Sequence, residues 1–106
     1  PGQRILVVTH VRELVEQNAK KLVDLWPDAP VGVYSAGLNR RDTEAQVIFA
    51  GIQSIANRAG ELGWFDLVLV DEAHLIPRGG EGRYRTYLQA LLSMNPAAKV
   101  IGFTAT

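Results

Sequence analysis

The amino-acid sequence predicts an α/β fold in which a mostly parallel β-sheet lies between two layers of helices, a three-layer α/β/α arrangement. Short apolar runs rich in β-branched residues alternate along the chain with segments whose apolar residues recur every three or four positions. Alternation of this kind is typical of βαβ units with parallel strands. The 106 residues suit one domain and contain no internal repeat, low-complexity segment or interdomain linker.

The first half of the chain is predicted to begin with a strand at 4–9, because "RILVVT" is an apolar run of the kind buried on both faces of a sheet. A helix follows at 12–26, where apolar residues keep a spacing of three or four, and "PDAP" at 27–30 ends it. The next segments are a short strand at 31–34 and the loop "SAGLNRR" at 35–41.

The second half repeats this alternation. It is predicted to contain a strand at 46–50, a helix at 52–59 that ends at Gly60 or Gly63, a strand at 65–70, a helix at 83–94 and a last strand at 99–103. A glycine-rich loop precedes the helix at 83–94.

Composition excludes several classes of protein. The chain has no cysteine, which rules out disulfides and thiolate metal sites. Its formal net charge is zero, so charge alone predicts no particular partner. The apolar runs are too short to span a bilayer, and the start "PGQRILVVT" lacks the pattern of a signal peptide. We therefore expect no membrane partner and an intracellular, cytoplasmic location, the nucleoid included.

Polar residues follow four of the predicted strands. They are "TH" at 9–10, "YSAG" at 34–37, "DEAH" at 71–74 and "TAT" at 104–106. The carboxyl ends of parallel strands meet at one edge of a sheet, where α/β proteins gather their functional side chains. The sequence thus predicts a functional site at this edge.

Asp71 and Glu72 directly follow a run of apolar residues. This is the acidic-strand pattern of P-loop NTPases, in which the Asp helps to hold Mg²⁺ and an adjacent carboxylate orients and deprotonates the attacking water. Two acids after a strand also occur in solvated turns, so this pair alone leaves both interpretations open.

The wider set of motifs resembles superfamily 2 helicases of the DEAD/DEAH-box type. "DEAH" and "TAT" resemble their motifs II and III, and "THVRELVEQ" resembles motif Ia, usually T-P-T-R-E-L-A-x-Q. Its residues Arg12, Glu13, Leu14 and Gln17 match motif Ia in identity and spacing. His10 and Val11 replace its Pro-Thr.

Two further segments extend the resemblance over Ile5 to Thr106. "VYSAG" takes the place of the glycine-containing motif of the family, and "VIFAGIQSI" takes the place of motif Ib. The resemblance implies a fragment of the first RecA-like ATPase lobe, a partial P-loop NTPase domain with ATP and Mg²⁺ as cofactors.

The resemblance also implies roles in ATP hydrolysis. Asp71 would bind Mg²⁺ through water, Glu72 would activate the hydrolytic water, and His74 would couple the nucleotide site to the rest of the motor. The residues that would link hydrolysis to strand separation are Thr104, Ala105 and Thr106.

A second surface is implied for nucleic acid. The turn that starts the helix at 12–26 would contact the sugar–phosphate backbone. In later segments, Gly37 would let the nucleic acid approach the protein backbone closely, and Gln53 and Ser54 would contact phosphates. The implied residues are Thr9, His10, Arg12, Glu13, Gly37, Gln53 and Ser54. Gly51 stands where the family often has threonine, so no side-chain contact is expected there.

Other residues have simpler interpretations. For Arg40 and Arg41 a solvated loop is favoured over a binding role. Tyr34, Tyr84 and Tyr87 suit core packing at least as well as stacking on bases.

A motor of this kind requires the phosphate-binding sequence G-x-x-x-x-G-K-[ST]. None of the three lysines, Lys20, Lys21 and Lys99, follows a glycine. We interpret 1–106 as a partial helicase ATP-binding domain that spans motifs Ia to III and lacks the Walker A loop. Its expected partners are the Walker A segment, whose strand would lie beside the "TAT" strand, and the second RecA-like lobe of the same polypeptide.

The expected function is part of an ATP-dependent DNA or RNA helicase that couples hydrolysis to unwinding or translocation, with DNA favoured and the isolated fragment inactive. The alternative is a non-enzymatic nucleic-acid- or protein-binding module derived from such a lobe. A receiver-like phosphoacceptor domain fits poorly, because "TH" rather than an acidic pair ends the first strand. A metal hydrolase using His10 and His74 lacks supporting ligand spacing.

Overall fold

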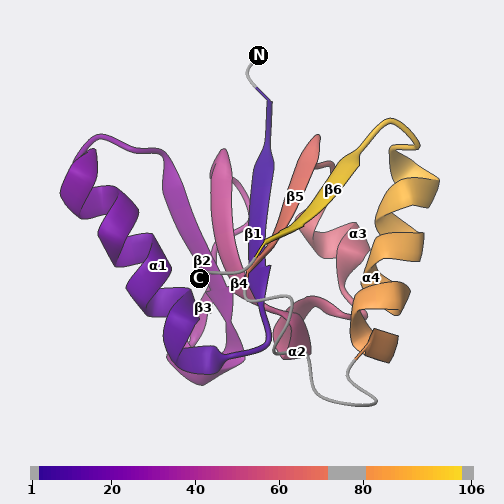
Figure 1. Ribbon diagram of the computed structural model, residues 1–106, viewed down its shortest axis with the longest axis horizontal. Coiled ribbons are helices and arrows are strands. Elements are labelled where there is room, and N and C mark those ends of the chain that lie inside the picture. The colour runs from indigo at the N-terminus through magenta and orange to yellow at the C-terminus, as the bar shows by residue number, and fades with distance from the viewer. Residues whose placement is uncertain (1–2, 72–80, 104–106) are drawn as a thin grey trace.

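Six strands form one sheet with helices on both faces in the computed structural model, which describes residues 3–71 and 81–103 (Figure 1). The elements in chain order are β1 (Ile5–Thr9), α1 (Arg12–Leu25), β2 (Val31–Ser35), the 3₁₀ turn η1 (Ala36–Leu38), β3 (Arg40–Arg41), β4 (Val47–Gly51), α2 (Ile52–Ile55), α3 (Ala59–Leu62), β5 (Leu67–Asp71), α4 (Glu81–Met94) and β6 (Lys99–Phe103). The strand order is β3-β2-β4-β1-β5-β6, and only the β2–β3 pair is antiparallel. The predicted α/β class with a mostly parallel sheet is confirmed.

The register of the central strands aligns their carboxyl ends. Thr9, the last residue of β1, lies beside Gly51 at the end of β4, and Val8 lies beside Val70 of β5. Tyr34 of β2 lies beside Ala50. The carboxyl ends of β1, β2, β4 and β5 therefore lie at the same edge of the sheet.

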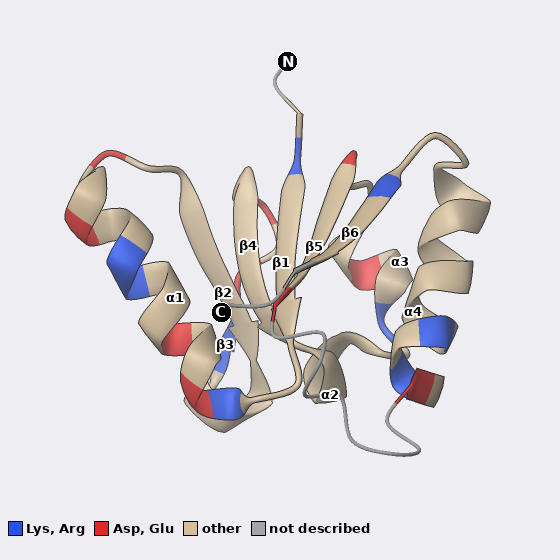
Figure 2. Cartoon of the chain, viewed as in Figure 1, with Lys and Arg blue, Asp and Glu red and all other residues tan. Residues whose placement is uncertain are grey.

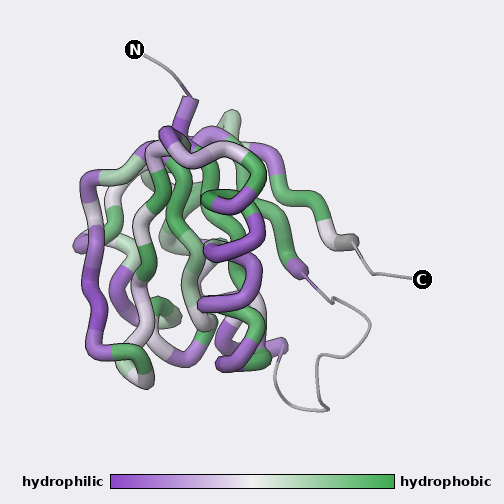
Figure 3. The backbone as a smooth tube through the Cα atoms, turned by 90° about the vertical axis from the view of Figure 1, so that its left-hand side faces the viewer, coloured by the Kyte–Doolittle hydropathy of each residue, from purple (hydrophilic) through white to green (hydrophobic). Residues whose placement is uncertain are grey.

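Two apolar cores fix the helices to the sheet. On one face, α1 packs Val15 and Ala19 against Val33 and Phe49. On the other face, α2, α3 and α4 enclose a larger core whose fully buried members include Leu6, Ile48, Phe65, Val68, Tyr87 and Leu91. The strands are mostly hydrophobic, whereas α1, which faces the viewer, carries many hydrophilic residues (Figure 3). In the described part of the chain, no helix has the length and hydropathy needed to cross a membrane.

All three tyrosines are buried, which confirms that they pack in the core. Two local predictions are wrong. The segment 35–41 is not simply a loop, because Arg40 and Arg41 form β3 against β2. This short strand is fixed by Asp42, whose carboxylate accepts a hydrogen bond from the Val33 N–H at 2.9 Å and whose own N–H donates to the Val33 carbonyl at 3.0 Å.

The predicted helix at 52–59 is also interrupted. It consists of α2 and α3, separated where Arg58 leaves helical geometry with φ −128° and ψ 28°. The Arg58 N–H donates to the Ile55 carbonyl at 2.9 Å, an i to i−3 bond that tightens the turn. Gly63 ends α3 with a φ of +80°, a conformation that glycine adopts without strain.

β6 is the outermost strand of the described sheet on its side. Two of its apolar residues, Val100 and Ile101, are 40% and 49% exposed. A strand of a parallel sheet is ordinarily covered on both faces, so this edge has the character of an incomplete surface.

Candidate functional site at the carboxyl edge of the sheet

The structure describes part of the predicted site. Asp71 closes β5, and the predicted nucleic-acid-binding residues all lie in or beside the loops at the same edge. The remaining predicted residues, Glu72, His74, Thr104, Ala105 and Thr106, lie outside the described residues.

Side-chain hydrogen bonds tie three of these loops together. The Gln53 Nε2 group at the start of α2 donates to the carbonyl oxygen of His10 at 3.0 Å. The Ala36 N–H, after β2, donates to Ser54 Oγ at 2.9 Å. Within the first loop, the Val11 N–H donates to Thr9 Oγ1 at 3.1 Å. Gln53 and Ser54, predicted as phosphate contacts, thus also hold the loops after β1 and β2 against α2.

A cavity of about 340 Å³ opens between these loops. Its lining consists of Arg12, Ser35, Ala36, Gly37, Gly51, Gln53 and Ser54. Four of these residues come from the predicted nucleic-acid surface, so the fold brings together groups that are up to 42 positions apart, from Arg12 to Ser54 (54 − 12). We call this space the Arg12 cavity.

Gly37 has a specific steric role in the Arg12 cavity. A Cβ at this position would lie 2.5 Å from Cδ and 3.0 Å from Nε of Arg12. Real Cβ atoms do not approach other heavy atoms so closely, so a larger residue would displace the Arg12 side chain. The missing side chain at Gly37 lets the arginine lie along the cavity wall.

Three other residues predicted to bind nucleic acid do not line the Arg12 cavity. Thr9 is only 1% exposed, and its hydroxyl serves the turn, so a nucleic-acid contact at Thr9 would come from the backbone. The Nδ1 atom of His10 is buried and has no hydrogen-bond partner among the described residues. Glu13 is exposed in the first turn of α1, where its negative charge suits the positive end of the helix dipole.

Asp71 is nearly buried, at 7% exposure, and is held by α1. The side-chain amide of Asn18 donates to Asp71 Oδ2 at 2.5 Å. Because α1 begins at Arg12, one helix contacts both the Arg12 cavity and the acidic strand end. The sequence reasoning missed Asn18. Asn18 could have been predicted to face the sheet, because it lies on the apolar face of the helix, three positions after Val15 and four before Leu22.

Tyr84 of α4 adds a neutral group near this carboxylate. Burial, and to a smaller extent the negative charge of Asp71, raises the pKa of the Tyr84 phenol to about 12. Its buried hydroxyl has no hydrogen-bond partner among the described residues. Burial also raises the pKa of Tyr87 well above its usual value.

Asp71 could provide one oxygen ligand to a magnesium ion. No described residue donates a hydrogen bond to its Oδ1 atom, and no group of three or more potential ligands occurs among 3–71 and 81–103. Mg²⁺ in phosphate-transfer sites takes one or two carboxylates and fills its remaining positions with water and phosphate oxygens. A single buried carboxylate at a strand end satisfies that requirement.

Taken together, this sheet order, the motifs at its carboxyl edge and the acidic end of β5 define a RecA-like lobe of superfamily 2 helicase type. The chain belongs to the ResIII family, described as "Type III restriction enzyme, res subunit", whose match extends over residues 1–106. No curated protein sequence matches it.

Solved structures agree with the fold. One of 44 matching chains is the UvsW helicase from Bacteriophage T4, with a TM-score of 0.72 and 19% sequence identity. The match covers 98% of this chain and 37% of the UvsW chain, so these residues span little more than a third of that protein. At this identity the likeness establishes the shared fold.

Proposed function

We propose that this chain is the part of an ATP-dependent helicase or translocase that holds the backbone of one nucleic-acid strand and supplies a carboxylate to Mg²⁺–ATP. The observation that carries the proposal is the dual contact of α1. Its first residue, Arg12, lines the Arg12 cavity, and Asn18 bonds to Asp71. A single rigid element therefore joins the two surfaces that a motor must couple.

The Arg12 cavity suits a phosphodiester backbone. Arg12 provides a guanidinium fork, which matches phosphate geometry, and the absence of a side chain at Gly37 leaves room for the Arg12 side chain. Contacts of this kind position a strand without reading its sequence. The description of the family names a restriction enzyme, which favours DNA over RNA.

The nucleotide side rests on Asp71 and on the resemblance of the residues around it. Mg²⁺ bound there would neutralise charge on the phosphate oxygens. In this proposal Glu72 is the general base, His74 couples the two sites, and Thr104, Ala105 and Thr106 transmit the state of the nucleotide. Other segments of the parent polypeptide supply the Walker A loop and the second lobe, with the strand of the loop beside β6.

Binding of fluorescently labelled single-stranded DNA to the 106-residue chain tests the nucleic-acid surface. We expect affinity in the micromolar range or weaker, falling as salt rises, because the chain has no net charge and few phosphate contacts. Arg12→Ala should weaken binding about tenfold, the equivalent of one charge-assisted hydrogen bond.

Lys21→Ala is the matched control, since it removes the same charge from the exposed side of the same helix, about 13 Å along the axis from Arg12. Equal affinities for the two variants would refute the proposed surface.

A further inference from the structure

A second cavity, of about 280 Å³, adjoins the Arg12 cavity. The two share three lining residues, and the remainder of the second cavity consists of Tyr34, Asn39, Arg40, Arg41 and Arg58. Three arginines and no acidic residue line this space, which we call the arginine cavity. Figure 2 shows basic segments on β3 and at the start of α1, toward the end of the molecule where β1 and β2 finish.

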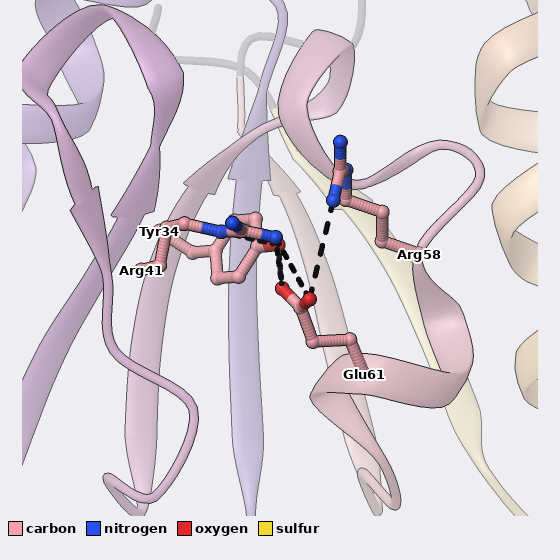
Figure 4. Close-up of polar contacts among 4 residues, drawn as sticks. All are labelled: Tyr34, Arg41, Arg58 and Glu61. Atoms are coloured by element: carbon pink, nitrogen blue, oxygen red, sulfur yellow. Dashed lines mark hydrogen bonds and ion pairs between the residues drawn. The ribbon is translucent and has the colours of Figure 1, made fainter.

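Glu61 of α3, which is not among the lining residues, contacts two of these arginines. Arg41 Nη2 donates to its two carboxylate oxygens at 2.8 and 3.1 Å, and Arg58 Nη1 lies 4.0 Å from the same group. The Tyr34 hydroxyl donates to Glu61 as well. Arg41 lies across the Tyr34 ring, with its guanidinium 5.8 Å from the ring centre, and Arg58 lies on the other side of the Glu61 carboxylate (Figure 4).

The arginine cavity has more positive than negative groups around it. Arg40 pairs with Asp42, whose pKa is lowered by the hydrogen bond from the Val33 N–H and by Arg40. Arg41 and Arg58 share the single carboxylate of Glu61. Three guanidinium groups thus face two carboxylates, and one positive charge remains beside the opening.

The arginines are available to a ligand. Their side chains are 52%, 59% and 53% exposed for Arg40, Arg41 and Arg58. Exposed ion pairs of this kind contribute little to stability. Contacts with Glu61 instead orient the guanidinium groups of Arg41 and Arg58 before a ligand binds, which lowers the entropic cost of binding an anion.

We infer that the arginine cavity binds a phosphodiester group of the strand that follows the Arg12 cavity, as a second phosphate subsite. The inference rests on the proposed function. Its volume lies near the lower end of the roughly 300–1,000 Å³ of ligand pockets, which suits one nucleotide unit. The Tyr34 ring is buried and its hydroxyl is engaged, so the subsite recognises the backbone and not a base.

Salt-dependent DNA binding tests the subsite. The association constant of labelled oligo(dT) is measured at several NaCl concentrations for the wild-type chain, Arg58→Ala and Lys21→Ala. Arg58→Ala removes one phosphate contact, so the negative slope of log K against log salt should become shallower by about 0.7 and binding should weaken several-fold. Lys21→Ala should leave both unchanged, and Arg58→Lys should keep most of the slope because it keeps the charge.

Glu61→Gln should strengthen DNA binding, whereas Arg58→Ala should weaken it. It removes a negative charge behind the cavity but keeps an acceptor for Arg41, so oligo(dT) should bind several-fold more tightly. If Glu61 served only the structure, this change would leave binding equal or weaker. The unfolding midpoint of each variant shows that the chain is folded.

The outcomes separate this inference from the proposed function. If Arg12→Ala weakens binding while Arg58→Ala and Glu61→Gln change nothing, the subsite is refuted and the proposed function stands. If the wild-type chain shows no salt-dependent binding, both fail. If Arg58→Ala weakens only the binding of inorganic phosphate, measured by calorimetry, the cavity takes a free anion and the assignment to nucleic acid is wrong.

Discussion

Tyr84 and Tyr87 make the stability of the chain depend on alkaline pH. The pKa of Tyr84 is raised by burial and by Asp71 to about 12, against an ordinary value of 10. Between pH 10 and pH 12 the unfolded chain has released this proton and the folded chain has kept it. The unfolded state then binds fewer protons, so the free energy of unfolding falls as pH rises, by roughly 1.4 kcal/mol per pH unit for each such group.

Urea unfolding at pH 9, 10 and 11 measures this effect. Tyr84→Phe should make the decline above pH 10 shallower by roughly 1.4 kcal/mol per unit, since it removes one of the groups responsible. At pH 9 the variant should be as stable as the wild type or more so, because it removes a buried hydroxyl without a described partner. Identical pH profiles for both proteins would show that Tyr84 is not responsible.

At the residue scale, the sequence predicts which groups gather at the edge but not how they contact one another. Arg12, Gly37, Gln53 and Ser54 were all assigned from motif resemblance, and all line one cavity. Asn18 was not assigned. Its bond to Asp71 depends on how α1 is rotated over the sheet, which a pattern of apolar spacing defines only to within a broad face.

At the element scale, Arg4 acts as the main polar link at the opposite end of the sheet. Its guanidinium donates to four carbonyl oxygens. Those of Thr43 at 2.8 Å and Ala45 at 3.0 Å lie in the loop before β4, that of Leu62 at 3.0 Å lies at the end of α3, and that of Trp64 at 3.0 Å lies in the loop before β5. The guanidinium also lies 4.4 Å from the centre of the Phe65 ring. The loops before β4 and β5 are thereby attached to the start of β1.

Arg4→Ala should lower the free energy of unfolding by about 3 kcal/mol, because several charge-assisted hydrogen bonds are lost together. Arg4→Lys should recover less than half of this loss, since one ammonium group cannot reach both loops as the planar guanidinium does. Urea denaturation gives the values. Arg85→Ala, an exposed change on α4, is the control and should stay within about 0.5 kcal/mol of the wild type. A similar result for Arg4→Ala would contradict the assigned role.

Most elements follow from apolar patterning, but the helix predicted at 52–59 does not. Ile52, Ile55, Ala59 and Leu62 keep a helical spacing and are all buried, so the sequence predicts one helix. The interruption at Arg58 arises from a tightened turn, and the nearby residues include no proline to announce it. The turn also places Arg58 in the arginine cavity with Arg40 and Arg41, the two arginines for which the sequence favoured a solvated loop.

At the scale of the whole molecule, the sheet is asymmetric. β1 and β5 are enclosed by neighbouring strands, whereas β6 presents exposed Val100 and Ile101 at the edge next to β5. In the proposed motor, the strand that leads to the Walker A loop pairs with β6 and brings the phosphate-binding loop beside Asp71. In this proposal, β6 would offer its unpaired backbone edge to that strand, and Asp71 would offer a carboxylate to the metal.

This division of the nucleotide site predicts that the 106-residue chain does not hydrolyse ATP. Its sequence has no glycine-rich loop followed by lysine, which is the segment that holds the β- and γ-phosphates in P-loop NTPases. Phosphate release from Mg²⁺–ATP should equal that of Glu72→Gln and of buffer, with or without DNA. In the full parent polypeptide, Glu72→Gln should reduce hydrolysis by at least about a hundredfold, the scale of a lost general base. Phosphate release by the 106-residue chain that Glu72→Gln abolishes would mean that these residues form a complete nucleotide site by themselves.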